Sequence, residues 1–404
     1  MQRKKDVLFL CQFFYPEYNS SATLPWDTAK YLARSGLSVG AVCGYPKEYN
    51  NIGKVPDKEE VDGVYIKRYH YIQLKRGKRL ARLINYFSFT FKILLHIGEL
   101  RKYKCVIVYT NPPILPIAAI LGNMLFGTKI VSVSFDVYPE VAYASGQLTA
   151  DGVIVKAMRI INHELIRHIS TIVALTNEMK KYLLSHRKGL LSEKVKVIPN
   201  WAHESRCEAE PSTLGQYGYT ENNFIVSYFG NMGICQDMET LLFAMDALKN
   251  EDNIKFFIIG HGLKKEVVIK RTQNLKNVHV IDFLTGKAFE QAIAISSCGI
   301  VSLETGLKGM CAPSKYYSYL QGGIPVISVV EEGSYLETEV NKESIGKSVH
   351  VGDGPGLVKA ITELASNKEL LNKMSDNAEK LYQNKYAAEI GLSKYLLLIK
   401  GLIK

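Results

Sequence analysis

The sequence has few of the features that mark secreted or metal-binding chains. None of its seven cysteines forms a CxxC pair, and their number is odd. This usage is ordinary for buried thiols in a reducing compartment and argues against a disulfide scaffold. No clustered carboxylates and no His/Cys set with zinc-ligand spacing are visible. We therefore expect a cytoplasmic protein with no metal and no other cofactor.

Long hydrophobic runs are also missing. The longest apolar stretch, residues 112–126, contains three prolines and an asparagine. It is shorter than the ~20 residues that a membrane-spanning helix needs. The N-terminal basic residues precede an apolar run too short for a signal peptide, which we interpret as a first strand. No transmembrane helix is expected, but peripheral attachment to a membrane remains open.

Positive charge is concentrated in one part of the chain. Fifty basic and 39 acidic residues give a formal charge of +11. The segment 67–104 alone holds eleven Lys or Arg and a single acid, Glu99, so the remainder is nearly neutral. A local basic and aromatic segment favours a surface patch for an anionic partner. Because no nucleic-acid-binding motif accompanies it, we do not expect nucleic acid as the partner.

Strand-like and helix-like stretches alternate along most of the 404 residues. In the first half, strands are expected over 6–14, 38–43, 64–71, 106–109, 129–134 and 171–175, and helices over 24–34, 80–100 and 153–168. The pattern then restarts, with strands expected over 193–199, 224–229, 254–259, 278–281, 299–303 and 325–328, helices between the later ones and a mostly helical tail from 357. Such alternation is typical of parallel sheets covered on both faces. The polar stretch 202–223 shows no periodicity, and we expect it to be the boundary between two doubly wound α/β domains. A ligand would bind at the carboxyl ends of the strands, in a cleft between the two sheets.

The first chemical motif is a pair of glycines, Gly230 and Gly233, between a strand and a helix expected to start near Gln236. Glycines let a backbone approach a phosphate closely, and a helix N-terminus offers free N–H groups. The alternative is a glycine turn with Asp237 as helix N-cap. The loop is not GxGxxG and no acid follows at dinucleotide spacing, which disfavours NAD. A second glycine turn, Gly260-His261-Gly262, is a weak signal alone.

The most informative motif spans residues 304–326. A glycine-containing loop leads to Pro313, Ser314 and Lys315 at the expected start of a helix, and Gly322-Gly323 ends that helix. A lysine at a helix start beside a glycine loop is well placed to bind a diphosphate. The alternative is a solvated charge.

Several short motifs along the chain together resemble retaining glycosyltransferases of family 4 (group 1). They are Phe14-Tyr15-Pro16-Glu17 with Ser20-Ser21-Ala22, Thr110-Asn111-Pro112-Pro113, Asp136-Val137-Tyr138-Pro139-Glu140, Ile198-Pro199-Asn200-Trp201, Gly230-Asn231-Met232-Gly233, and Pro313-Ser314-Lys315 through Gly323-Ile324-Pro325-Val326. The resemblance implies the GT-B fold, which has two Rossmann-like domains. The domains would be 1–200 for the acceptor and 201–385 for the nucleotide sugar, with a helix at 386–404 packing back on the first.

The resemblance also implies which residues do what. The donor would be a nucleotide sugar, usually linked to UDP, and the acceptor a glycan or a polyprenyl-diphosphate-linked sugar in bacterial surface-polysaccharide synthesis. Lys315 and Asp136 would be the catalytic residues. The residues implied for the nucleotide sugar are Gly230, Asn231, Gly233, Phe283, Leu284, Gly309, Met310, Cys311, Ser314, Lys315 and Ser318. Those implied for the acceptor are Glu17, Ser20, Ser21 and Asp136.

The chain departs from the family pattern at three places. Two glutamates that the family has in this loop and helix, with seven residues between them, are Met310 and Ser318 here, which weakens ribose recognition by that route. Phe135 stands where many relatives have a histidine. No basic residue follows the first glycine pair, which leaves more of the diphosphate charge to Lys315.

Two other functions compete with the transferase. A nucleotide-sugar epimerase shares this architecture but usually needs carboxylates in its cleft. A nucleotide-sugar-binding subunit without activity would agree with the loss of the two glutamates. The basic segment, including Lys75, Arg76, Lys78, Arg79 and Arg82 before an aromatic run, predicts peripheral attachment to the inner face of an anionic plasma membrane. A solvated helix face with core aromatics is the alternative.

Overall fold

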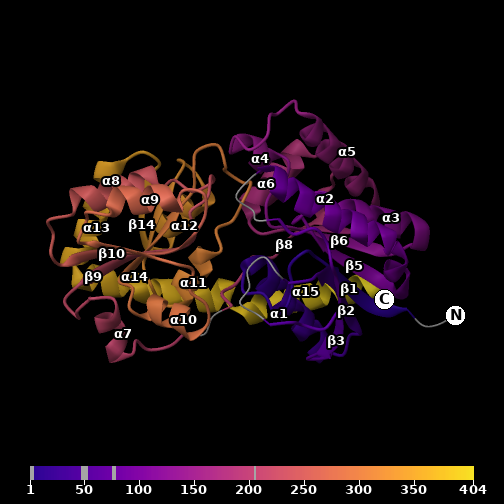
Figure 1. The fold of residues 1–404 in the computed structure, drawn as a ribbon, viewed down its shortest axis with the longest axis horizontal. Helices are drawn as coiled ribbons and strands as arrows, with labels where there is room; N and C mark the ends of the chain where they lie inside the picture. Colours follow the sequence, from indigo (N-terminus) through magenta and orange to yellow (C-terminus); the bar gives the residue numbers. More distant parts are fainter. Residues whose placement is uncertain (1–3, 47–52, 75–78, 204–205) are drawn as a thin grey trace. The chain divides into compact units, whose positions relative to one another are not determined.

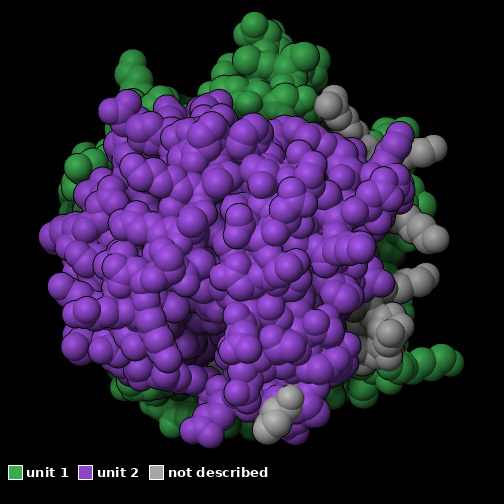
Figure 2. Space-filling view, turned by 90° about the vertical axis from the view of Figure 1, so that its left-hand side faces the viewer, with its two compact units in different colours: residues 1–203, 309–312, 388–404 green, residues 204–308, 313–387 purple. Residues whose placement is uncertain are grey.

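A computed structural model describes residues 4–46, 53–74, 79–203 and 206–404. The chain divides into two compact units (Figure 2). Unit 1 contains residues 1–203, 309–312 and 388–404, and unit 2 contains residues 204–308 and 313–387. Each unit is an α/β body built around its own sheet.

Unit 1 is built around an eight-stranded sheet with the order β3-β4-β2-β1-β5-β6-β7-β8. Every neighbouring pair is parallel except β3 and β4, which form an antiparallel edge that the sequence reading missed. The order reverses between β1 and β5, where the chain turns back across the sheet. The strands are β1 (Lys5–Leu10), β2 (Val39–Gly44), β3 (Lys58–Val61), β4 (Val64–Tyr69), β5 (Tyr103–Tyr109), β6 (Lys129–Ser134), β7 (Thr171–Ala174) and β8 (Val195–Val197).

Alternate side chains of this sheet enter two different layers. On one face, Phe9, Ile107 and Val133 pack in a cluster with helix α1 (Ser20–Arg34) and the C-terminal helix α15 (Ala388–Ile403). Helices α3 (Pro116–Phe126) and α2 (Arg79–Leu95) are absent from that cluster, and α3 lies against β5 and β6. By the two-residue period of strands, α2 and α3 cover the opposite face. The remaining helices of unit 1 are α4 (Glu140–Ala144), α5 (Val153–His168) and α6 (Asn177–His186), which Figure 1 places with α2 and α3.

The C-terminal helix α15 belongs to unit 1 although it follows unit 2 in the chain. Leu392, Tyr395 and Ile399 are buried in the cluster around β1 and α1. Tyr31 of α1 donates a hydrogen bond to Glu389 at 2.7 Å. The chain thus returns to unit 1 at residue 388.

Unit 2 is built around a six-stranded, all-parallel sheet with the order β11-β10-β9-β12-β13-β14. Its strands are β9 (Phe224–Asn231), β10 (Ile254–His261), β11 (Val278–Ile281), β12 (Cys298–Ser302), β13 (Val326–Val330) and β14 (Gly346–His350). Tyr228, Phe256 and Ile300 enter a core with helices α8 (Glu239–Ala247) and α13 (Gly354–Ser366). Its other helices are α7 (Pro211–Gln216), α9 (Lys265–Thr272), α10 (Lys287–Ala294), α11 (Lys315–Gln321), α12 (Tyr335–Lys342) and α14 (Lys368–Leu381).

The structure differs from the sequence prediction at several elements, and no helix was predicted where α3, α4 and α6 lie. The stretch expected to have no periodicity contains the short helix α7, which Pro211 opens. Helix α12 and strand β14 lie in a part of the chain to which no element was assigned. The expected helix 80–100 ends at Leu95, and a 3-10 helix follows over Ile97–Lys102.

Candidate active site

The two glycine motifs of unit 2 lie side by side at the carboxyl ends of β9 and β10. The strands pair Gly230 with Gly260, so the loops that follow them are neighbours. A Cβ atom built on Gly260 would lie 1.8 Å from the carbonyl oxygen of Gly230, and one on Gly262 would lie 2.5 Å from that of Met232. Only glycine fits at these positions, because the two backbones touch.

Replacing Gly260 by alanine is therefore expected to destabilise unit 2. The added methyl would force the two strands apart, and we expect a loss of roughly 1–3 kcal/mol in the free energy of unfolding, the range for overpacked cores. Urea unfolding measures this loss of stability. Gly98→Ala is the matched control, because a Cβ at Gly98 meets nothing within 4 Å. Equal unfolding midpoints for the two variants would contradict this packing.

The loop after β9 has fewer free backbone N–H groups than its sequence suggested. The N–H of Gly233 donates to Oε1 of Gln236 at 3.0 Å. Oδ1 of Asp237 accepts from the N–H groups of Glu239 at 3.0 Å and of Thr240 at 3.2 Å. The helix starts at Glu239 rather than near Gln236, and its first donors are taken by Asp237. Asp237 thus accepts from the first N–H groups of the helix, although the N-cap position itself is Met238.

Lys315 lies close to the glycine that opens this loop. It is the first residue of α11, and its Cε lies 3.8 Å from a Cβ built on Gly230. Its Nζ atom is buried and has no hydrogen-bond partner among the described residues. Burial lowers the pKa of Lys315 well below its ordinary value. The alternative of a solvated charge is therefore wrong.

The ring of Tyr228 packs against the ammonium group of Lys315. Nζ of Lys315 lies 3.5 Å from the centroid of the Tyr228 ring, a cation–π distance. The Tyr228 hydroxyl donates to the carbonyl of Asn231 at 2.8 Å. From α11, the Tyr319 hydroxyl accepts from the N–H of Phe229 and donates to the carbonyl of Ser227, each at 3.1 Å. These contacts fix α11 against the strand that leads into the glycine loop.

A second lysine approaches the loop from the neighbouring glycine turn. Nζ of Lys264 donates to the carbonyl of Gln236 at 2.5 Å and to Glu304 at 2.6 Å. The position after the first glycine pair, where the family has a basic residue, is therefore approached by a lysine from elsewhere in the chain. Its charge is partly balanced by Glu304, whereas no carboxylate of the described residues pairs with Lys315.

The other residues expected to bind the nucleotide sugar fall into two places. Phe283 is exposed after β11, and its ring meets the His261 ring edge-on at 5.3 Å, with Leu284 half-buried beside it in sequence. Ser314 is exposed in front of α11, and Ser318 is buried within that helix. All four belong to unit 2 together with Gly230, Asn231, Gly233 and Lys315.

Gly309, Met310 and Cys311 instead make their contacts within unit 1. The N–H of Gly309 donates to Glu178 at 2.9 Å, and the carbonyl of Met310 accepts from the N–H of Val137 at 2.7 Å. Cys311 forms an isolated antiparallel bridge with Asp136. This loop therefore lies beside the residue expected to bind the acceptor.

The expected acceptor residues lie at the carboxyl ends of the strands of unit 1. Ser20 and Ser21 begin α1, and Nδ2 of Asn111 donates to Oγ of Ser21 at 3.4 Å. Asp136 follows β6, and burial raises its pKa to about 6. Glu17 is buried in the loop before α1. The structure thus brings Ser21 and Asp136 to the same edge of the sheet, which contains the point where the strand order reverses.

Comparisons with known proteins agree with this two-unit arrangement. Residues 22–201 match the family model described as "Glycosyl transferase 4-like domain", and residues 213–381 match "Glycosyl transferases group 1". The chain belongs to the group 1 glycosyltransferases. It is thus an enzyme that transfers a glycosyl group, and its fold is GT-B.

Individual relatives of this transferase are distant in sequence. WbjE of Pseudomonas aeruginosa, named as a probable glycosyltransferase, is 25% identical over 341 residues, which cover 82% of this chain and 81% of WbjE. WcaI of Escherichia coli K12, named as a candidate glycosyl transferase of colanic acid biosynthesis, is 30% identical over 162 residues, 37% of this chain and 40% of WcaI. The crystal structure of Anabaena HepE in complex with UDP and glucose matches with a TM-score of 0.70 at 13% identity, over 98% of this chain and 100% of that one.

Sequence reasoning did not single out two residues of the candidate site, Tyr228 and Lys264. Tyr228 has a local signal, since it lies two residues before Gly230 in a strand and therefore on the same side of it. Lys264 has no signal in the local sequence, because its approach to Gln236 depends on how two separate loops pack.

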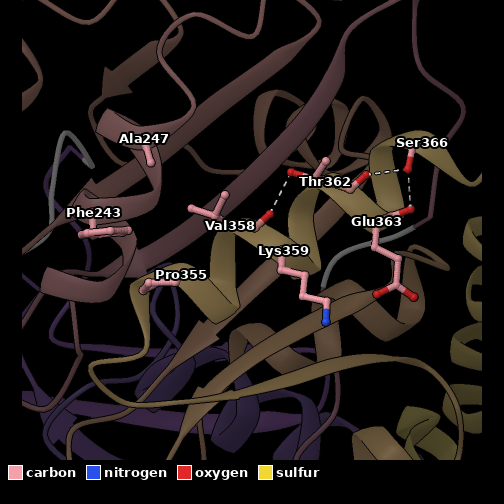
Figure 3. A pocket seen from close by; sticks show the side chains of 8 residues that line it. All are labelled: Phe243, Ala247, Pro355, Val358, Lys359, Thr362, Glu363 and Ser366. Atoms are coloured by element: carbon pink, nitrogen blue, oxygen red, sulfur yellow. Dashed lines mark hydrogen bonds between the residues drawn. The ribbon is translucent and has the colours of Figure 1, made fainter.

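The groove in Figure 3 does not suit a diphosphate. It measures about 590 Å³ and lies between α8 and α13 of unit 2. Phe243, Pro355 and Val358 make most of its wall apolar, and Lys359 is its one cation. The glycine loop and Lys315 do not line it.

Two negative findings concern the described residues alone. Within residues 4–46, 53–74, 79–203 and 206–404, no three His, Cys, Asp or Glu side chains gather closely enough to hold a metal ion. Over the same ranges, no helix is both long and apolar enough to cross a membrane.

Proposed function

We propose that this enzyme transfers a sugar from a UDP sugar, with retention of configuration, to a lipid-linked or oligosaccharide acceptor in the synthesis of a bacterial surface polysaccharide. The matching HepE structure contains UDP and glucose, and the relative WcaI is named for colanic acid biosynthesis. Both support this donor class and this pathway class. We further propose that the reaction needs no metal or other cofactor.

The observation that carries the proposal is the enclosed ammonium group of Lys315 beside the glycine loop. As the bond between the sugar and the diphosphate breaks, negative charge grows on the leaving phosphate. A preorganised cation in a water-poor site stabilises that charge strongly. A bound diphosphate would also raise the pKa of the lysine again, because an opposite charge favours the protonated form.

The transfer itself then requires no protein nucleophile. The bond between the anomeric carbon and the diphosphate oxygen breaks on the same face on which the acceptor hydroxyl forms its new bond. The hydroxyl proton goes to the leaving phosphate oxygen. Asp136 orients the acceptor by accepting a hydrogen bond, and Glu17, Ser20 and Ser21 complete its site. Gly230, Asn231, Gly233, Phe283, Leu284, Ser314 and Ser318 surround the nucleotide, and Gly309, Met310 and Cys311 border the sugar.

A thermal-shift screen against UDP, GDP, ADP and their sugars tests the donor. A ligand that binds only the folded state adds ~2.7 kcal/mol at a hundred times its dissociation constant. We expect a shift selective for UDP and one UDP sugar, followed by UDP release when acceptor is added. Interconversion of the sugar without UDP release would indicate the epimerase, and a shift without turnover would indicate a binding subunit. No shift with any nucleotide would contradict the proposal.

A further inference from the structure

An ion pair of unit 2, Lys264 with Glu304, lies across the end of strand β9. Lys264 follows β10 and directly precedes α9, and Glu304 follows β12. In the sheet, β9 lies between β10 and β12, so the two residues approach the end of β9 from opposite sides. Nζ of Lys264 and Oε1 of Glu304 are 2.6 Å apart. The pair therefore meets at the loop that is proposed to hold the diphosphate.

Backbone hydrogen bonds fix both residues to that loop. The N–H of Lys264 donates to the carbonyl of Met232 at 2.9 Å, and the N–H of Glu304 donates to the carbonyl of Cys235 at 2.9 Å. Nζ of Lys264 also donates to the carbonyl of Gln236 at 2.5 Å. The position of this ammonium group is thus set by the loop itself rather than by a mobile surface.

The ammonium group of Lys264 can also bind a ligand. An ammonium has three N–H donors, and Gln236 and Glu304 accept two of them. The Lys264 side chain is 29% exposed and that of Glu304 is 35% exposed, so a dissolved anion can reach the pair. Ion pairs as accessible as this one are weak, because water screens them and both side chains lose freedom. An anion with more than one negative charge can therefore displace the carboxylate.

The other charges around the loop favour such an anion. Lys315 approaches the loop from α11, and no described residue accepts a hydrogen bond from its buried Nζ atom. The Asp237 carboxylate is already bonded to the first N–H groups of α8. Glu304 is therefore the carboxylate that an arriving diphosphate has to displace. A diphosphate has two phosphate groups, one for each lysine.

We propose that Lys264 is a second diphosphate-binding residue of this transferase, and that Glu304 lowers the affinity for the donor by competing for Lys264. On donor binding, Lys264 keeps its hydrogen bond to the carbonyl of Gln236 and exchanges Glu304 for a phosphate oxygen. Glu304 acts through Lys264 and is thus a positioning residue. This inference rests on the proposed function for the identity of the donor.

Calorimetric titration of the full chain with UDP and with inorganic pyrophosphate tests the pair. We expect Lys264→Met to bind both ligands at least about tenfold more weakly, since a hydrogen bond to a charged group is lost. Glu304→Gln should bind both about fivefold more tightly, because an accessible ion pair no longer has to be broken. A gain in affinity cannot come from a misfolded variant.

The double variant shows whether Glu304 acts through the lysine. In a chain that already carries Lys264→Met, adding Glu304→Gln should bring no gain in affinity. The matched control is the pair Lys347 and Glu363, also in unit 2, whose charged atoms are 2.5 Å apart and whose side chains are 30% and 41% exposed. Lys347→Met and Glu363→Gln should both bind UDP as wild type does.

Equal affinities for UDP in wild type, Lys264→Met and Glu304→Gln would overturn the inference and leave the proposed donor standing. An equal gain from Glu304→Gln with and without Lys264 would also overturn it, because Glu304 would then act only as a nearby negative charge. A wild-type chain that binds pyrophosphate, with the expected order of variants, but not UDP would refute the proposed donor alone. Binding of neither ligand would refute both.

Discussion

Replacing Lys315 by methionine is expected to lower kcat/KM for sugar transfer by about 10²–10³-fold, the effect of removing one preorganised donor from a developing anion. Methionine fills a similar volume without charge. The Tyr319 hydrogen bonds to β9 should keep α11 in place. Initial rates of UDP release with acceptor measure the effect, and thermal unfolding checks that the variant is folded.

The matched control is Lys308→Met. Lys308 lies in the same loop region, and its Nζ donates to the carbonyl of Glu332 at 3.3 Å in an exposed position. The Lys308→Met variant should transfer sugar at nearly the wild-type rate. If Lys315→Met retained wild-type kcat/KM, or if both variants lost activity equally, Lys315 would have no special role in the reaction.

The substitution Asp136→Asn is expected to change activity and stability in opposite directions. Burial holds the pKa of Asp136 near 6, above its ordinary value of 3.8. At pH 7.5 the carboxylate is charged in both the folded and unfolded states, so folding carries a cost of up to ~3 kcal/mol for burying it. Asparagine removes that cost and should raise the free energy of unfolding at this pH.

The activity of Asp136→Asn should fall, because a hydrogen bond from the acceptor to a charged group is worth about 1.5–3 kcal/mol, roughly 10- to 150-fold in rate. In wild type, the rate should decline as the pH drops through 6 and the carboxylate takes up a proton. Stability from this group changes the other way, because it increases as the pH falls through 6 toward 4. The test is to measure the transfer rate and the free energy of unfolding as a function of pH, for wild type and for Asp136→Asn. A variant that is both active and unchanged in stability would exclude Asp136 from the site.

Alternation of strands and helices was sufficient to predict most of the fold. The expected bounds of β6, α5 and β11 agree with the structure, because each is an apolar or amphipathic run with clear ends. Helix α1 begins four residues earlier than expected, at Ser20, because its polar first turn has no helical periodicity. The antiparallel β3 was missed since Lys58–Val61 is a charged edge strand, which lacks the hydrophobic signal of buried ones.

The site was predictable where it depends on local sequence and not where it depends on packing. The glycines at 230, 260 and 262 and the lysine at 315 stand out in the sequence, and the structure brings them together in unit 2. Gln236 and Asp237 accept hydrogen bonds from backbone N–H groups of the loop. This could not be predicted from the sequence, because it depends on the geometry of the two side chains.

The unpaired positive charge of the segment 67–104 is smaller than its sequence suggested. Glu99 pairs with both Lys67 and Lys102, at 2.8 and 2.9 Å, and Asp6 pairs with Lys104 at 3.0 Å. These pairings join residues that are mostly far apart in the sequence, so counting charges along the chain could not reveal them. Three of the basic residues singled out in this segment lie outside the described residues, namely Lys75, Arg76 and Lys78. Peripheral attachment of the segment to an anionic membrane stays a prediction.

Calorimetric titration of UDP into wild type and Lys315→Met tests the central claim most directly, because it measures donor binding without needing the acceptor. The account predicts saturable binding of UDP to the wild-type chain. It predicts binding at least about tenfold weaker in Lys315→Met, a loss of about 1.4 kcal/mol or more, and unchanged affinity in Lys308→Met. Equal affinities for wild type and Lys315→Met would contradict it.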